Sequence, residues 1–240
     1  MAGPRPLLPA PAPEVVAARL EALRVRIADA GRDPSAVRIV AVTKGFDVGA
    51  VRAARAAGID DIGENYAPEL LAKAEALLAA EPAGGAGAPL GAGVRWHYIG
   101  AVQRRRVPAL APVVSWWETV CRVEEGRAIA ARAPGAVVLV EVDTTDIAGR
   151  NGVAPAAVPG LVRALCEDGL EVRGLMTVAP PGGGARARAA FRTTARLAAE
   201  LGLAELSMGM TDDLEPALAE GSTMVRVGRA LFGERPPATG

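Results

Sequence analysis

From residue 14 onward the chain alternates between two patterns of hydrophobic and polar positions. The segment "PEVVAARLEALRVRIADAG" has the spacing of an amphipathic helix, and Gly31 is positioned to end it. Its apolar stripe consists of Val16, Leu20, Leu23 and Ile27. The next segment, "VRIVAVT", is a short apolar run that predicts a buried strand.

The same alternation continues to the end of the chain and predicts eight strands, each followed by a helix. The predicted strands are residues 37–43, 60–65, 95–102, 112–117, 136–144, 171–179, 204–210 and 223–228. The predicted helices that follow them are residues 48–58, 66–81, 103–110, 118–132, 155–168, 185–202, 211–221 and 229–233. Strands separated by helices pair in parallel through right-handed crossovers, and eight such units close into a single (β/α)8 TIM barrel. A doubly wound open sheet is the alternative α/β fold.

Composition fits one α/β domain. The chain has 240 residues, of which 50% are hydrophobic and only 3% aromatic, so aliphatic side chains must build the core. We expect the barrel to occupy residues 14–235. The proline-broken segment 1–13 is expected to be a disordered lead-in, and residues 236–240 a disordered tail. The glycine-rich stretch 82–93 is interpreted as a loop insertion.

Charge and cysteine content exclude several classes of function. The formal net charge is zero and the isoelectric point is near 6.6, so no global field attracts nucleic acid or an anionic membrane. No apolar run is long enough to cross a bilayer. Cys121 and Cys166 lack a metal-binding or redox spacing, which is typical of reduced cytoplasmic thiols. His97 is the one histidine, so a core role is expected instead of a metal site, and Gln103–Arg106 is interpreted as a solvated basic face.

Lys44 is the first candidate for chemistry. The chain contains 27 lysines and arginines, but its only lysines are Lys44 and Lys73. Lys44 follows the first predicted strand on the same side as Val40 and Val42, at the barrel face where active sites lie. A poorly hydrated lysine can act as a nucleophile toward a carbonyl group, which arginine cannot do because it stays protonated. The alternative is a lysine that extends to solvent from a strand end.

The last two strands indicate a phosphate site. Backbone N–H groups at Gly228, Arg229 and Ala230 begin a helix, and Thr211 is expected at a helix N-cap after the seventh strand. A tight turn and a plain cap are the alternatives for these residues. Arg226 shares a strand side with Gly228 and needs an acceptor, either a ring nitrogen, a phosphate or an internal carboxylate.

Several motifs together resemble one known family. "VAVTK", "GENY", "WHYIGAVQ", "RGLMTVAP", "LSMGMTDDLEPALAEGSTMVRVG" and "ALFGER" occur in the order and spacing of the pyridoxal-phosphate homeostasis proteins, also called proline synthetase co-transcribed homologues. The resemblance covers the chain from about residue 14 to 235. It implies a barrel similar to the N-terminal domain of alanine racemase that holds pyridoxal 5′-phosphate (PLP).

The resemblance also implies roles for individual residues. Lys44 matches the family lysine that forms a Schiff base with PLP, Arg226 matches the arginine facing the pyridine nitrogen, and Asn65 lies beside the cofactor. The phosphate-binding turns match Thr211, Gly228 and Arg229. The chain departs from the family where Thr43 replaces a serine, where Arg229 replaces a threonine, and where "AVQRRR" replaces "HLQSNK".

These features favour binding over catalysis, and no catalytic residue is predicted. Turnover of an amino acid on PLP usually needs a pyridinium nitrogen paired with a carboxylate, and an arginine there weakens the electron sink. Racemisation also needs acid and base groups on both faces of the α-carbon, whereas the only tyrosines are Tyr66 and Tyr98. We therefore expect a monomeric cytoplasmic protein that stores, buffers or delivers PLP, with PLP-dependent apo-enzymes as partners. The alternatives are a single-domain PLP-dependent amino acid racemase and a cofactor-free Schiff-base lyase of the aldolase type.

Overall fold

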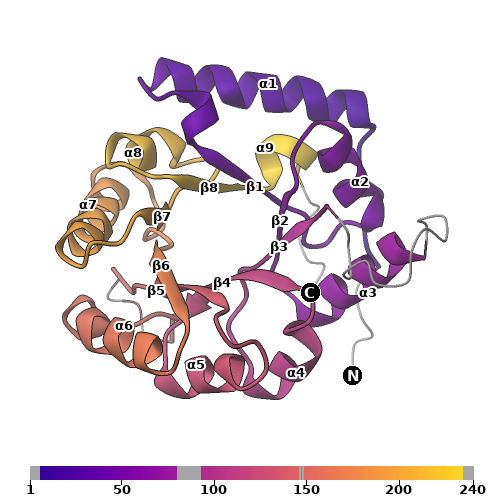
Figure 1. The fold of residues 1–240 in the computed structure, drawn as a ribbon. Coiled ribbons are helices and arrows are strands. Elements are labelled where there is room, and N and C mark those ends of the chain that lie inside the picture. Colours follow the sequence, from indigo (N-terminus) through magenta and orange to yellow (C-terminus); the bar gives the residue numbers. More distant parts are fainter. Residues whose placement is uncertain (1–5, 80–92, 146, 148, 235–240) are drawn as a thin grey trace.

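Eight parallel strands form a closed barrel in the computed structural model, which describes residues 6–79, 93–145, 147 and 149–234 (Figure 1). The strands are β1 Arg38–Val42, β2 Asp61–Glu64, β3 Arg95–Tyr98, β4 Val114–Val120, β5 Val137–Glu141, β6 Glu171–Met176, β7 Glu205–Ser207 and β8 Met224–Val227. They follow one another in chain order, and β8 pairs with β1 to close the ring, Val40 lying opposite Arg226. The predicted (β/α)8 barrel is therefore confirmed, and the open-sheet alternative is wrong.

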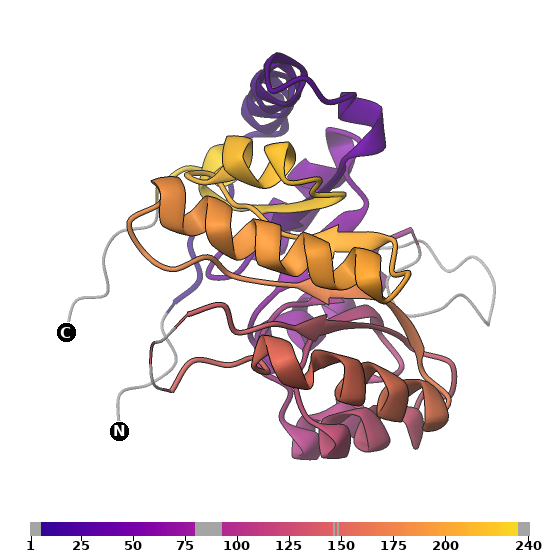
Figure 2. The ribbon, with the colours of Figure 1, turned by 90° about the vertical axis from the view of Figure 1, so that its left-hand side faces the viewer.

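Helices surround the barrel and cover its outer face (Figure 1). They are α1 Pro13–Asp29, α2 Val48–Ala56, α3 Ala67–Leu78, α4 Val107–Leu110, α5 Val123–Ala130, α6 Val158–Glu167, α7 Gly184–Glu200, α8 Leu214–Ala219 and α9 Arg229–Phe232. Short 3-10 turns at Pro34–Ala36, Arg104–Arg106 and Pro155–Ala157 precede β1, α4 and α6. Figure 2 shows the long helix α7 lying along the outside of the molecule beside α8.

The first helix forms for the reason that its apolar spacing predicts. All four stripe residues are buried: Val16, Leu20, Leu23 and Ile27. Pro13 occupies the first helical turn, where its missing N–H costs nothing, and Gly31 has a φ of 76°, a conformation that reverses the chain after the helix. The buried stripe packs α1 against α2, α8 and α9.

The core has two parts, one on each side of the strands. A small apolar cluster fills the barrel interior, consisting of Val40, Trp116, Leu139, Met176 and Met224. A larger cluster lies between the strands and the helices and includes Ala41 from β1. Successive residues of β1 thus point alternately inward and outward, so Lys44, two residues after the lining residue Val42, falls on the inward side.

Strand β4 is longer than its sequence pattern predicts. The predicted strand ended at residue 117 and the predicted helix began at 118, whereas the strand continues to Val120 and α5 begins at Val123. The prediction failed because the apolar run ends at Trp117, and the charged residue Glu118 interrupts the pattern of a buried strand. The structure buries this carboxylate completely, and partners from other strands stabilise it there.

The segment before α1 is described from residue 6. Leu8 forms a parallel bridge with Phe46, and its carbonyl accepts a hydrogen bond from the Asp47 N–H. This part of the expected lead-in therefore lies alongside the loop after β1. Residues 1–5 and 236–240 and almost all of the 82–93 insertion lie outside the described residues. The domain limits therefore stay a prediction. None of the described helices is both long and apolar enough to cross a bilayer.

Candidate cofactor site

A cavity of about 580 Å³ opens where the strands end, at the carboxyl face of the barrel. Its described lining includes every cofactor-binding residue predicted from the sequence: Lys44, Asn65, Thr211, Arg226, Gly228 and Arg229. These residues come from segments as far apart as β1 and α9, and the closed barrel brings them to one place. Their role as ligands stays a prediction.

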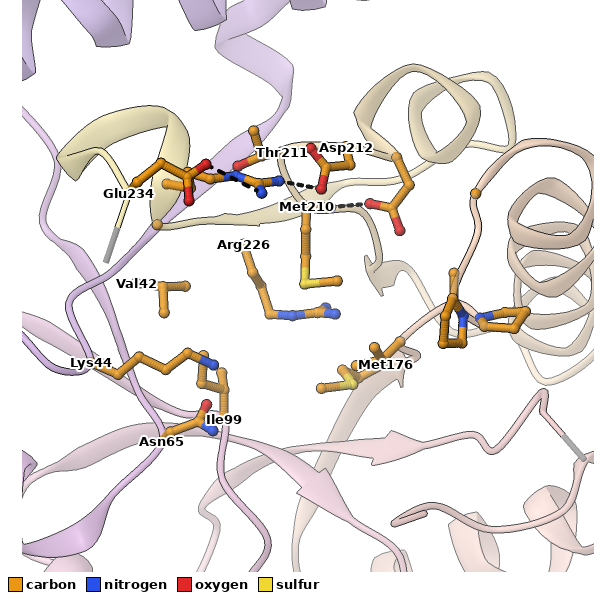
Figure 3. A pocket seen from close by; sticks show the side chains of 18 of the residues that line it. Val42, Lys44, Asn65, Ile99, Met176, Met210, Thr211, Asp212, Arg226 and Glu234 are labelled. Atoms are coloured by element: carbon orange, nitrogen blue, oxygen red, sulfur yellow. Dashed lines mark hydrogen bonds and ion pairs between the residues drawn. The ribbon is translucent and has the colours of Figure 1, made fainter. Parts of the chain in front are cut away.

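Lys44 lies on the turn that follows β1, and its side chain is half-buried. Figure 3 shows this side chain extending into the cavity, with Asn65 beside it and Val42 on the same wall. Asn65 comes directly after the last residue of β2. The structure thus favours the cavity-facing lysine over the alternative of a lysine that reaches bulk solvent.

Arg226 reaches into the cavity from β8 and is only 4% exposed. Its Nη1 donates to the carbonyl of Ser207 at 2.6 Å and to the Ser207 hydroxyl at 2.7 Å, and its Nη2 donates to the Thr177 carbonyl at 2.8 Å. Burial lowers the pKa of Arg226, and nearby Glu118 opposes that effect. A guanidinium stays protonated even so, and these acceptors fix its orientation. Figure 3 shows the Arg226 side chain extending into the cavity.

A buried network of hydrogen bonds extends from Ser207, a partner of Arg226, to Asp61. The Ser207 hydroxyl donates to Glu118 at 2.6 Å, and Glu118 also contacts His97 Nδ1 at 2.5 Å. His97 Nε2 lies 2.9 Å from Asp61. Burial alone would lower the pKa of His97, but hydrogen bonds to Asp61 and Glu118 outweigh it and raise this pKa. His97 is thus a buried core residue. The internal carboxylate considered as an acceptor for Arg226 is that of Glu118, which is linked to Arg226 through the Ser207 hydroxyl.

The turns after β7 and β8 meet at the cavity. The Ala230 N–H donates to the Thr211 hydroxyl at 3.3 Å, which joins the two turns. Thr211 is not the helix N-cap that the sequence predicted, because α8 begins at Leu214 with Asp213 in the N-cap position. Asp213 accepts a hydrogen bond from the Met210 N–H, so residues 210–213 form a turn before the helix can start.

Gly228 and Arg229 contribute differently to this end of the cavity. A Cβ atom at Gly228 would lie 3.1 Å from the Val42 carbonyl oxygen, so the backbone approaches β1 closely. The Arg229 side chain is exposed and pairs with Asp212 and with Glu234, the latter at 3.6 Å (Figure 3). The backbone at Gly228 thus approaches β1, and the Ala230 N–H contacts the turn that follows β7.

Sequence analysis missed Glu141, which also lines the cavity. This residue ends β5, is buried, and accepts a hydrogen bond from the Asn151 side chain. Burial raises the pKa of Glu141. A signal was present in the sequence, because "VVLVEV" contains one charged residue in an otherwise apolar strand.

The closed parallel barrel brings a lysine and a buried arginine to one cavity. The family model of the alanine racemase N-terminal domain matches residues 18–236, so the chain is a protein of that class. Curated relatives narrow the class. The chain belongs to the pyridoxal phosphate homeostasis protein family. It is 40% identical to the pyridoxal phosphate homeostasis protein of Deinococcus radiodurans over 90% of this chain and 99% of that protein. The protein of the same name from Pseudomonas aeruginosa is 38% identical over 86% and 88% of the two chains.

Solved structures agree with this assignment. PipY of Synechococcus elongatus with PLP bound superimposes with a TM-score of 0.76 at 29% identity, covering 91% of this chain and 100% of PipY. Lysine decarboxylase from Selenomonas ruminantium has a TM-score of 0.68 at 17% identity, covering 95% of this chain and 64% of that enzyme. The latter likeness is one of fold alone.

Proposed function

We propose that this protein binds PLP as a Schiff base on Lys44 and serves in PLP homeostasis by storing, buffering or delivering the cofactor. The observation that carries the proposal is the convergence of six predicted ligands on one cavity. Membership of the homeostasis family and the PLP bound to the relative PipY support it. We also propose a cytoplasmic location, a monomeric state and PLP-dependent apo-enzymes as recipients.

The residues that line the cavity fit the chemical groups of PLP. A primary amine suits its aldehyde, a fixed guanidinium suits its ring nitrogen, and the turns at Thr211 and Gly228 suit its phosphate. Ile99 and Met176 supply apolar surface for a ring (Figure 3). The cavity volume lies in the range of small-molecule sites.

Each residue then has a defined task. When bound, PLP supplies an aldehyde that condenses with an amine and releases one water molecule. Lys44 provides the amine, and its half-buried position limits competing water. Arg226 would orient the ring and, because its guanidinium donates hydrogen bonds without losing a proton, would leave the ring nitrogen unprotonated. The turns at Thr211, Gly228 and Arg229 would hold the phosphate.

We propose that the site binds without turnover of an amino acid. The described lining of the cavity contains no tyrosine, histidine or cysteine, and its buried carboxylates, Glu141 and Asp213, are held by hydrogen bonds from the Asn151 side chain and the Met210 N–H. Tyr98 is buried and donates to the Ala101 carbonyl, while Tyr66 is exposed just before α3. The relatives that show the family are named for homeostasis.

The binding proposal is tested by absorption spectroscopy and mass spectrometry. Purified protein incubated with PLP should show a visible band that borohydride abolishes, and the reduced cofactor should be found on the peptide that contains Lys44. Lys44→Ala should show neither the band nor the adduct while still binding an aldehyde-free analogue, pyridoxine 5′-phosphate. An unmodified Lys44 in the wild-type protein would refute the proposal.

Absence of turnover is tested separately. The PLP-loaded protein, incubated with L-alanine in deuterated water, should incorporate no α-deuterium beyond the rate of free PLP. Mass spectrometry of the recovered amino acid measures this exchange, with an authentic alanine racemase as the positive control. Exchange that is abolished in Lys44→Ala would instead support the single-domain racemase.

A further inference from the structure

The second lysine of the chain lies next to the first in space, outside the cavity. Lys73 belongs to α3, is 2% exposed, and does not line the cavity. Its Nζ donates to the Thr43 carbonyl at 2.9 Å and pairs with the carboxylate of Glu64. A second carboxylate, that of Glu69, lies 3.7 Å from the same nitrogen.

These side chains hold the backbone on both sides of Lys44. Lys73 binds the carbonyl of Thr43, which precedes Lys44, and Glu69 accepts a hydrogen bond from the Gly45 N–H, which follows it, at 2.8 Å. The Thr43 hydroxyl donates to Glu64 at 2.8 Å. We call Thr43, Glu64, Glu69 and Lys73 the Lys73 cluster.

The turn itself needs such support. Gly45 has a φ of 78°, and the turn is closed by a hydrogen bond from the Phe46 N–H to the Thr43 carbonyl at 3.1 Å. The Gly45 carbonyl accepts from the Leu8 N–H at 3.0 Å. The Thr43 carbonyl, the Gly45 N–H and the Gly45 carbonyl are therefore all hydrogen-bonded. Two of these bonds come from charged side chains on α3, those of Lys73 and Glu69.

Stability alone does not account for the cluster. A buried ion pair is often no more stabilising than apolar residues of similar volume, because removing two charges from water costs about as much as their attraction returns. Lys73 occupies the apolar stripe of α3 between Leu70 and Leu77, where a leucine or methionine fits the helical pattern. Burial also raises the pKa of Glu64, which shows how unfavourable its site is for a charge.

We propose that Lys73 is a positioning residue, which with Glu69 fixes the turn at residues 43–46 so that the Lys44 amine meets a ligand aldehyde at one constant place. This inference rests on the proposed function, since it concerns the bond formed at Lys44. A displacement of about 1 Å in a reacting group can slow a reaction by up to about a hundredfold, so loss of the cluster should affect the covalent step. Binding of the ring and phosphate, which other turns hold, should change little.

The test compares Lys73→Met, Glu69→Ala and Glu69→Gln with the wild-type protein. Stopped-flow absorption at saturating PLP measures the rate at which the visible band forms. Lys73→Met and Glu69→Ala should slow it by about tenfold or more. Glu69→Gln should restore most of the rate, because an amide oxygen can still accept the Gly45 N–H. All three variants should bind pyridoxine 5′-phosphate with wild-type affinity.

Leu77→Ala is the matched control for a general loss of stability. Leu77 is buried on the same helix but has no part in the Lys73 cluster, so its truncation should destabilise α3 and leave the rate unchanged. Wild-type rates in both Lys73→Met and Glu69→Ala would overturn the inference, as would equal slowing in Leu77→Ala. Failure of the wild-type protein to label Lys44 would instead refute the proposed function, so the two failures are distinguishable.

Discussion

At the scale of single residues, Lys44 and Arg226 reach one cavity from the neighbouring strands β1 and β8. Lys44 and Arg226 could be placed because strand alternation and the barrel's carboxyl face are local rules. Lys73 gave only a weak signal, a charge on an apolar stripe, because its burial depends on Glu64 from another element. Thr211 was misplaced as a cap, since its partner is the Ala230 N–H of the following strand–helix turn.

Arg226 gives a prediction at this scale. Arg226→Ala removes a charged donor from the cavity, so PLP should be lost on dialysis at least about tenfold faster than from the wild-type protein. Arg226→Lys keeps the charge but not the paired donors that hold Ser207 and Thr177, and should retain PLP to an intermediate degree. The visible band during dialysis measures retention. Equal retention in all three proteins would show that Arg226 does not contact the cofactor.

At the scale of elements, a polar network connects strands that are distant in the barrel. Asp61 in β2, His97 in β3, Glu118 in β4, Ser207 in β7 and Arg226 in β8 are joined by successive hydrogen bonds. The strand pattern could predict each element but not this network, because its members are far apart in sequence. Glu118 is the clearest case, since its partners extend β4 past the predicted end.

The network predicts a specific pH dependence of stability. Burial acts to raise the pKa of Asp61, but hydrogen bonds to Arg95 and His97 lower it, so its stabilising effect is present above the usual carboxyl range and is lost as the pH falls. The pKa of His97 is raised, so its contribution is full below about pH 6.5 and is lost as the pH rises through the raised value. The stabilisation should therefore be greatest between about pH 4 and 6.5.

Asp61→Asn tests this dependence. Within that pH range it should lower the free energy of unfolding by about 2 kcal/mol, less than the usual cost of breaking a buried pair because the amide oxygen remains an acceptor. The difference from the wild-type protein should shrink on both sides of the range. Urea denaturation at a series of pH values measures it. A difference that does not shrink as the pH rises would mean that His97 is uncharged in the folded protein.

At the scale of the whole molecule, the fold was the most predictable property. Eight strand–helix repeats leave few ways to bury both faces of a parallel sheet. Pairing of β1 with β8 closes the sheet into a barrel, in which every strand has two neighbours. The exact element ends were less predictable, because hydrogen bonds between distant segments set them. The cavity follows from closure, since it forms only when β1, β2, β7 and β8 end at one face.

Because the cavity joins elements from both ends of the chain, a ligand there should stabilise the fold as a unit. PLP at a free concentration of a hundred times its Kd should raise the free energy of unfolding by about 2.7 kcal/mol, and the thermal midpoint by about 5 °C or more. Differential scanning calorimetry measures the shift. Pyridoxal, which lacks the phosphate, should give a smaller shift at the same concentration; no shift with PLP would contradict binding to the folded state.

The near absence of lysine limits where an aldehyde ligand can react with the protein itself. Almost all of its basic side chains are arginines, whose guanidinium groups do not condense with aldehydes under ordinary conditions, and one of the two lysines is enclosed between α3 and the barrel. Surface lysines on a protein that binds a reactive aldehyde would otherwise be slowly modified by the ligand. Because Lys73 is buried and Lys44 lines the cavity, the protein surface has almost no other lysine amine for the aldehyde to modify. Covalent labelling should therefore stay close to one ligand molecule per chain even when the ligand is in excess.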